Sequence, residues 1–437
     1  MEFQAVKGMR DILPEEFNLF KHVMAIIQQI FDNYGYQELS MPILEPFELF
    51  AAKSGEEIKD TMYVFEDKAG RKLALRPEMT ASIARLYITY FMKGVKKPLR
   101  LAYIGPCYRY DNPQFGRYRE FRQAGLELLG SEFPEADAEI LIACDDLMTR
   151  LGFTAFHLKV GHVGILREIL AQEGMDEEFQ NKILSLIDRN KIEEIFQLFQ
   201  EQNLPDNVIS IIRELMQLKG KNIQELTEQA SVLLESYPQA MSTLQNLKEI
   251  LTLYLSYGEQ TRILVDFGFA RGLEYYTGMI FEIFIEDLAI AVGGGGRYDN
   301  LIANFQGEAT PAVGCAPGID RIVLALTQKK MVEPEGEAYA KRIMVACLDE
   351  IILPEALKIT QMIRKGNFST EFDVGRKKLK NLLTFAANKK IRYVVIVGSK
   401  EIVKKEVIVR DLAIEQQEAV PLDDLMNYLK EKIESGN

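Results

Sequence analysis

The sequence lacks the marks of a membrane-spanning, secreted or disulfide-rich protein. No apolar run in its 437 residues approaches the ~20 residues that span a bilayer. The first ten residues have no apolar core of the kind found in a signal peptide. Cys107, Cys144, Cys315 and Cys347 are widely spaced and form no Cys-x-x-Cys pair, which argues against a disulfide scaffold or a zinc ribbon. We therefore expect a cytoplasmic protein.

Histidine is also scarce, and the glycine-rich stretch lacks nucleotide-loop spacing. His157 and His162 are neighbours but do not have helical ligand spacing, so ordinary polar roles are expected and no protein-held metal site is predicted. The run Gly293–Gly296 has neither a following Gly-Lys-Ser/Thr nor Gly-x-Gly-x-x-Gly spacing. Glycines in a strand let a substrate approach the backbone closely, and a purely structural bulge is the alternative.

Length and charge predict more than one domain. A chain of 437 residues is expected to form two or three domains. Residues 341–437 carry 18 Lys and Arg against 14 Asp and Glu, a net charge of +4, whereas the remainder carries 34 against 50, a net charge of −16. A basic tail on an acidic body is compatible with RNA binding without establishing it. We expect a first domain over 1–330, a linker over 331–338 and a second domain over 339–437.

The chemistry of the first domain centres on one stretch, residues 107–130. Apolar segments at either end predict two strands, and Asp111-Asn-Pro113 with Gly116 supplies turn residues between them. The stretch contains four arginines, whose planar guanidinium groups match phosphate oxygens. A charged, solvated hairpin is the alternative for this stretch taken alone. Those arginines are Arg109, Arg117, Arg119 and Arg122.

This stretch resembles motif 2 of the class II aminoacyl-tRNA synthetases. Residues 109–125 read Arg-Tyr-Asp-Asn-Pro-Gln-Phe-Gly-Arg-Tyr-Arg-Glu-Phe-Arg-Gln-Ala-Gly, which is similar to the archaeal branch of the histidyl-tRNA synthetases. Residues 271–278, Arg-Gly-Leu-Glu-Tyr-Tyr-Thr-Gly, closely resemble a signature peculiar to that family. Residues 33–46 resemble motif 1, whose proline lies at a subunit interface, and 312–326 resemble motif 3. The resemblance implies an α+β fold with an antiparallel-sheet catalytic domain.

The resemblance also implies a set of binding residues, which local chemistry supports. Glu78 and Thr80 match residues that receive the α-ammonium group of the amino acid, although a helix cap at Thr80 is the alternative. Glu127 and Tyr276 would together satisfy the donor and the acceptor of a neutral imidazole. The histidine set comprises Glu78, Met79, Thr80, Arg109, Gln123, Glu127, Arg271, Tyr275, Tyr276 and Tyr298. The ATP set comprises Arg109, Asp111, Arg117, Phe121 and Arg321.

Two segments are expected to meet the tRNA. The helical character of residues from about 161 to 258 predicts an insertion, which in the family lies over the acceptor stem. In the second domain, alternating strands and helices predict a small α/β fold with a largely parallel sheet, resembling the family's anticodon-binding domain. A solvated helix face is the alternative for its basic cluster. Candidate tRNA contacts are Asn112, Gln114, Arg376, Lys377, Lys378 and Lys380.

The activity implied is formation of histidyl-adenylate from L-histidine and ATP with Mg²⁺, then transfer of histidine to tRNA(His) by a homodimer. Arg109 and Arg271 would act on the α-phosphate as the catalytic residues. The sequence has Asp111 and Asp320 where the family commonly has glutamate, which shortens the reach by one methylene. The rival reading is a catalytically inactive paralogue, the histidine-sensing regulatory subunit of ATP phosphoribosyltransferase. A pure RNA-binding protein is a third reading, and it leaves the pocket pattern unexplained.

Overall fold

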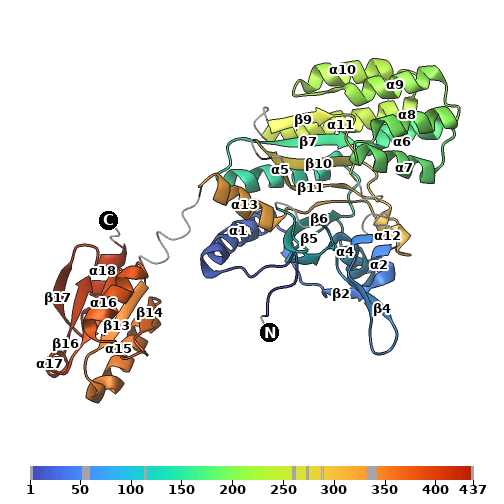
Figure 1. Ribbon diagram of the computed structural model, residues 1–437. Coiled ribbons are helices and arrows are strands. Elements are labelled where there is room, and N and C mark those ends of the chain that lie inside the picture. Colours follow the sequence, from blue (N-terminus) through green and yellow to red (C-terminus); the bar gives the residue numbers. More distant parts are fainter. Residues whose placement is uncertain are drawn as a thin grey trace. The chain divides into compact units, whose positions relative to one another are not determined.

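The computed structural model describes residues 3–51, 60–112, 116–257, 262–271, 275–286, 288, 290–331 and 342–434. The chain divides into two compact units, Met1–Val332 and Glu333–Asn437 (Figure 1). Apart from Met331, the linker predicted over 331–338 lies outside the described residues. No helix in the described ranges is long and apolar enough to cross a bilayer.

A nine-stranded sheet forms the framework of the first unit. Among its described strands only β1–β5 and β7–β9 pair in parallel, and the other neighbours are antiparallel. The expected antiparallel catalytic sheet is therefore confirmed. In spatial order the strands are β1 (Gln37–Glu38), β5 (Leu99–Tyr108), β6 (Glu120–Leu129), β12 (Ala312–Cys315), β11 (Ala291–Arg297), β10 (Met279–Ile285), β7 (Phe156–His162), β9 (Ile263–Asp266) and β8 (Lys219–Gly220).

The predicted central hairpin is the longest pair in this sheet. Strands β5 and β6 run in register from Leu99 opposite Leu129 to Tyr108 opposite Glu120. Helix α1 (Pro14–Asn33), expected over 17–34, starts with proline in its first turn and ends just before Gly35, whose φ is +70°. It packs on α5 (Pro134–Arg150) and α13 (Ile319–Gln328), which lie against β12 and β6.

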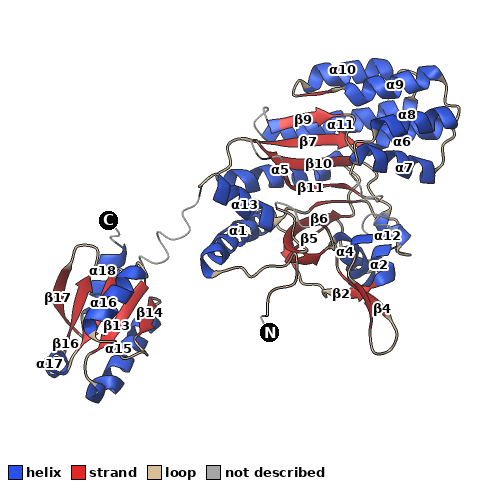
Figure 2. Cartoon of the chain, in the orientation of Figure 1, coloured by secondary structure: helices blue, strands red, loops and turns tan. Residues whose placement is uncertain are grey.

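The predicted helical region lies beside β7 and β9 (Figure 2). Asp176 caps α7, because its carboxylate accepts a 2.8 Å hydrogen bond from the Phe179 N–H. Ile183 and Ile187 on the predicted apolar face are buried. The helices are α6 (Val163–Gln172), α7 (Glu177–Asp188), α8 (Ile192–Glu201), α9 (Asp206–Gln217), α10 (Ile223–Leu233) and α11 (Pro238–Tyr257).

A small three-stranded sheet, β2–β4–β3, stands beside the large one. Its hairpin turns at Gly70, where φ is +75°. Next along the chain, a short α4 is followed by a π-helical turn, η1. These elements are β2 (Leu44–Pro46), α2 (Phe47–Ala51), β3 (Val64–Glu66), β4 (Lys72–Leu75), α4 (Thr80–Leu86), η1 (Tyr87–Phe91) and, later in the chain, α12 (Leu301–Asn304).

The second unit is the predicted small α/β fold, but its sheet is only half parallel. Strands β14, β13 and β15 pair in parallel, whereas β16 and the unpredicted β17 continue antiparallel. The connections 398–405 and 412–415 are too short for a parallel crossover, which explains the change. The elements are β13 (Arg342–Cys347), η3 (Glu350–Ile352), α15 (Leu353–Lys365), β14 (Ser369–Phe372), α16 (Leu379–Asn388), β15 (Tyr393–Val397), α17 (Ser399–Val403), β16 (Glu406–Asp411), β17 (Gln416–Pro421) and α18 (Leu425–Glu434).

Candidate active site

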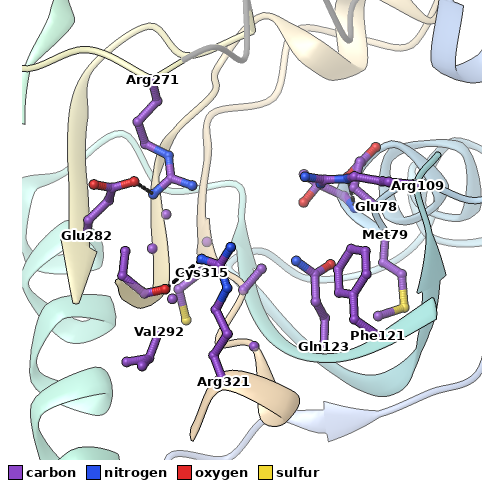
Figure 3. Close-up of a pocket in the computed structure, with 18 of the residues that line it drawn as sticks. Glu78, Met79, Arg109, Phe121, Gln123, Arg271, Glu282, Val292, Cys315 and Arg321 are labelled. Carbon is purple, nitrogen blue, oxygen red and sulfur yellow. Dashed lines mark hydrogen bonds and ion pairs between the residues drawn. The ribbon is translucent and has the colours of Figure 1, made fainter. Parts of the chain in front are cut away.

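A cavity of about 310 Å³ opens over β6, β12, β11 and β10 of the large sheet. Residues at the start of α4 and at the start of α13 also line it, and Figure 3 shows several of the lining side chains. Every residue that the sequence predicts for the amino acid or the nucleotide lines this one cavity. Those residues are Glu78, Met79, Thr80, Arg109, Asp111, Arg117, Phe121, Gln123, Glu127, Arg271, Tyr275, Tyr276, Tyr298 and Arg321.

Glu127 on β6 is the buried acid of the cavity. It accepts hydrogen bonds from the hydroxyls of Thr80 and Tyr103, each at 3.0 Å, and from the hydroxyl of Tyr298. Burial raises the pKa of Glu127 from 4.5 to about 7, although these hydroxyls oppose the rise. Gly314 faces the carboxylate on the neighbouring strand, where a Cβ atom would collide with it. The Glu127 carboxylate therefore fits over the sheet only because the paired position on β12 is glycine.

Three tyrosines form an aromatic wall next to this acid. The ring of Tyr275 lies 4.9 Å from that of Tyr276 and 5.8 Å from that of Tyr298, centroid to centroid. All three side chains are buried. The first pair of rings is tilted and the second meets edge to face, so the wall combines aromatic surface with hydroxyl groups beside one carboxylate, which suits a flat, polar ring.

Glu78 caps helix α4, a role for which the sequence indicated Thr80 as the candidate. The carboxylate of Glu78 accepts hydrogen bonds from the backbone N–H groups of Thr80 and of Ala81, the latter at 3.1 Å, and so caps α4. The Thr80 hydroxyl instead donates to Glu127. Burial also raises the pKa of Glu78. A cation placed between these two carboxylates would offset part of their desolvation cost.

Three arginines surround the other half of the cavity. Figure 3 shows Arg271 and Arg109 on opposite sides of the open space, with Arg321 rising from below. Backbone carbonyls fix each guanidinium group: Arg109 donates to Pro77 at 2.8 Å, Arg271 to Phe281 at 3.0 Å, and Arg321 to Ala291 at 2.7 Å. This half of the cavity is consequently a preorganised anion site.

Electrostatics support that conclusion. The pKa of Arg321 is lowered by burial and by its cationic neighbours Arg117, Arg109 and Arg271. Like charges held this close destabilise one another in the absence of an anion. A bound polyphosphate would reverse the sign of these interactions.

The glycines of β11 leave space for the side chain of Arg271. Gly294 lies directly under Arg271, and a Cβ atom there would collide with its Nη1 atom and with the Phe281 carbonyl. Glu282 on β10 pairs with Arg271 at 3.4 Å. The sequence did not predict Glu282 as a site residue, because its strand position alone does not distinguish it from an ordinary polar residue.

Comparison with known proteins decides the family. A model of the histidyl-tRNA synthetase family matches residues 8–322, and a model of the anticodon binding domain matches 342–432. The histidine–tRNA ligase of Methanocaldococcus jannaschii is 38% identical over 426 residues, covering 98% of this chain and 99% of that protein. The chain belongs to the histidyl-tRNA synthetase family. It is a class II histidine–tRNA ligase, with histidine, ATP and tRNA as partners, as the motifs indicated.

Further relatives agree with this assignment. The histidine–tRNA ligase of Sulfolobus acidocaldarius is 37% identical, covering 98% of each chain, and the predicted archaeal affinity is confirmed. Histidyl-tRNA synthetase from a Nostoc species has a similar fold, with a TM-score of 0.79 at 21% identity, covering 99% of this chain and all of that one. A Bacillus halodurans structure, named as an ATP phosphoribosyltransferase regulatory subunit/histidyl-tRNA synthetase, has a TM-score of 0.77 at 24% identity, covering 91% and 99%. At these identities the two structures show the fold alone.

The two departures from the family's motifs occupy different surroundings. Asp320 is buried; its carboxylate accepts a 2.6 Å hydrogen bond from the Arg122 N–H and lies 3.3 Å from Arg10. Asp111 lies at the cavity margin, and its carbonyl accepts a 3.1 Å hydrogen bond from the Arg119 side chain. Asp320 is thus anchored to motif 2, and Asp111 marks the start of the loop.

The candidate tRNA residues that the structure of this synthetase family member describes lie at its surface. Asn112 is exposed, and Gln114 lies outside the described residues. Arg376, Lys377 and Lys378 precede α16, which begins at Leu379. Arg376 forms an exposed ion pair with Glu350, and Lys377 forms one with Asp373. The fourth member of the cluster, Lys380, is exposed in the first turn of α16.

Proposed function

We propose that the cavity forms histidyl-adenylate and then transfers the histidyl group to the 3′ end of tRNA(His). The observation that carries this proposal is the position of Arg109 and Arg271, which face one another across a cavity that also contains Glu127. Two guanidinium groups on opposite walls suit one phosphate between them. The buried acid beside the tyrosines suits the side chain of the amino acid whose carboxylate attacks this phosphate.

In the proposed histidine subsite, Glu127 accepts the N–H of a neutral imidazole. A carboxylate has about four acceptor positions, and hydroxyls occupy three of those of Glu127 here. Tyr276 donates to the other imidazole nitrogen, and Tyr275 and Tyr298 form the wall. Gln123 and Met79 complete the subsite, while Glu78 and the Thr80 hydroxyl receive the α-ammonium group. Desolvation of both carboxylates supports a ligand that carries donors and positive charge.

In the proposed ATP subsite, Arg109 and Arg271 hold the α-phosphate, and Arg117 and Arg321 bind toward the β- and γ-phosphates. Phe121 stacks on the adenine, and Asp111 lies at its edge. The ring of Phe121 already lies 5.4 Å from the Arg109 guanidinium group, which brings the base and α-phosphate positions close together. An oxygen of the histidine carboxylate then forms a bond to the α-phosphorus as the bond to pyrophosphate breaks, and pyrophosphate leaves with the electron pair.

No protein nucleophile is required, and no proton moves in this step. Acceleration comes from orientation and from charge stabilisation of the five-coordinate phosphorus. In the second step a hydroxyl of the terminal ribose attacks the histidyl carbonyl carbon. AMP leaves with the bonding electrons, and the hydroxyl proton is released.

Mg²⁺ is proposed to enter with ATP. Among the described residues no group of three or more His, Cys, Asp or Glu side chains could hold a metal ion. The carboxylate of Glu282 lines the cavity beside Arg271 and would face such an ion. Magnesium often binds through one or two carboxylates plus substrate phosphates, and this donor set fits that mode. A magnesium ion bound in this way would neutralise negative charge on the phosphates of ATP.

The remaining proposals concern domains and assembly. We propose residues up to about 330 as the catalytic domain, 331–338 as a linker, and 339–437 as the domain that reads the anticodon through Arg376, Lys377, Lys378 and Lys380. Asn112 and Gln114 are proposed to approach the 5′ guanosine of tRNA(His). A cytoplasmic location follows from use of the product in translation.

A homodimer through motif 1 is proposed as well. Support comes from four exposed apolar side chains, two at the end of that motif and two on β3 of the small sheet, with exposed fractions between 38% and 45%. They are Ile43, Leu44, Val64 and Phe65. Light scattering at several protein concentrations measures the assembly, and a monomer throughout would exclude the dimer.

Histidine-dependent exchange between ATP and pyrophosphate tests the first step, and charging of tRNA(His) tests the second. Exchange that needs histidine and is lost in Arg271→Ala supports the proposal. The alternative, a histidine-sensing regulatory subunit of ATP phosphoribosyltransferase, has one favouring observation, the name of the Bacillus halodurans relative. That alternative predicts histidine binding without any exchange.

A further inference from the structure

The N-terminal segment Lys7–Arg10 contacts motif 2 and motif 3 at once. Val6 to Met9 form a turn closed by a 2.8 Å hydrogen bond from the Met9 N–H to the Val6 carbonyl, and Gly8 has a φ of +85°. A residue with positive φ at the third position is typical of a type II turn and favours glycine. The turn directs the Gly8 carbonyl toward the Arg119 N–H, which donates to it at 2.8 Å.

Arg119 strengthens this attachment at the base of the motif 2 loop. Its side chain donates to the Lys7 carbonyl at 3.3 Å and to the Asp111 carbonyl at 3.1 Å. The guanidinium group also lies over the ring of Tyr110, 3.6 Å from the centroid. The backbone of the segment therefore fixes the place where the loop leaves the sheet.

The side chain of Arg10 makes the second attachment. Its Nη1 atom donates to Glu16 at the start of α1, and its Nη2 atom lies 3.3 Å from the Asp320 carboxylate in motif 3. The flat face of the guanidinium group lies 4.3 Å from the centroid of the Tyr118 ring in motif 2. A lysine could not make these three contacts together, because it lacks the planar fork.

Two of those partners belong to the cavity wall. Tyr118 and Asp320 both line the cavity, next to Arg117 and Arg321 respectively. Arg10 itself does not line the cavity. Its Nε atom is buried and has no hydrogen-bond partner among the described residues, an arrangement that costs stability. The position of Arg10 is thus better explained by what it holds than by its contribution to folding.

We propose that Arg10 is a positioning residue for ATP. It holds Asp320 and Tyr118 in a fixed relation, so that the motif 2 and motif 3 sides of the nucleotide subsite are set before ATP binds. The proposal rests on the placement of ATP proposed above. Within the described part of the chain, Arg10 contacts Glu16, Phe20, Tyr118 and Asp320, none of which belongs to the histidine subsite, so its influence is confined to the nucleotide.

Calorimetric titration tests this proposal with two probes applied separately, Mg–ATP and L-histidine. The variants are Arg10→Met, Arg10→Lys and the control Arg100→Met. Arg100 on β5 makes a two-pronged ion pair with Glu139 of α5, at 2.8 and 2.6 Å, away from the cavity lining. Its side chain is 33% exposed, against 25% for Arg10, so the control loses a comparable ion pair.

Arg10→Met is expected to weaken ATP binding about tenfold, equivalent to ~1.4 kcal/mol, and to leave histidine binding within about twofold. Arg10→Lys should fall between wild type and Arg10→Met, and Arg100→Met should bind both probes normally. Unchanged ATP affinity in Arg10→Met would overturn the proposal, as would an equal loss for both probes or the same loss in the control. Because titration requires no turnover, absence of pyrophosphate exchange in the wild type would instead count against the proposed function.

Discussion

Replacing Glu127 with glutamine should stabilise the protein while impairing its recognition of histidine. Glu127 has its pKa raised by burial from 4.5 to about 7. At ~1.4 kcal/mol per pKa unit, keeping this carboxylate ionised in the folded state costs ~3 kcal/mol at high pH. Below pH 4.5 the group is protonated in both states and costs nothing. The free-energy cost of ionising buried Glu127 therefore grows as pH rises from 4.5, its pKa in the unfolded chain, to about 7, its pKa in the folded protein. The stability advantage of Glu127→Gln over the wild type should accordingly grow by ~2–3 kcal/mol between pH 5 and 8.

Urea unfolding of wild type and variant at several pH values measures this difference. In the same preparations the Michaelis constant for histidine in pyrophosphate exchange should rise at least tenfold, because a hydrogen bond to a charged acceptor contributes ~1.5–3 kcal/mol. Tyr103→Phe is a useful control, since it removes one donor to the same carboxylate and keeps its charge. A stability difference between Glu127→Gln and wild type that does not vary with pH would refute the reasoning.

Three other outcomes are expected. Arg271→Ala should slow adenylate formation by a factor of about 10²–10³, the cost of losing one preorganised donor. The control Arg392→Ala, in the second unit, should leave ATP–pyrophosphate exchange unchanged. Near-normal exchange by Arg271→Ala would show that Arg271 takes no part in the chemistry. Lys378→Glu with Lys380→Glu should reduce tRNA charging and its salt dependence while sparing exchange, and equal loss of both activities would contradict an anticodon role. His162 caps α6 by accepting a 3.2 Å hydrogen bond from the Gly164 N–H, and burial lowers its pKa to about 4. The variant His162→Asn should keep this cap and should lose less stability than the wild type as pH falls from 6.5 toward 4. Acid unfolding followed by circular dichroism measures the difference.

The local physics of the sequence was sufficient for the hairpins and most helices. Residues 99–129 form the expected pair of strands because turn residues between two apolar runs act over a short range. The Asp176 cap was predictable for the same reason. Strand β17 and the antiparallel half of the second sheet were missed, because pairing direction depends on connection length and on neighbours distant in the chain.

Side-chain roles in the cavity divide along the same line. Motif chemistry indicated Arg109, Arg271 and Glu127 from residue type and order. It could not indicate that Glu78 would cap α4 while Thr80 turned to Glu127, since that choice depends on which neighbour is within reach. Nor could it pair Arg10 with Asp320, 310 residues later.

By itself the sequence determined the chemical groups available and the short segments that present them. The tertiary structure alone decided burial, and burial is what moved the pKa of Glu127 to about 7 and set cationic groups against one another around Arg321. Desolvation and Coulomb energy depend on distances across strands that the chain order does not specify. For that reason candidate site residues could be proposed from the sequence, while their electrostatic states required the fold.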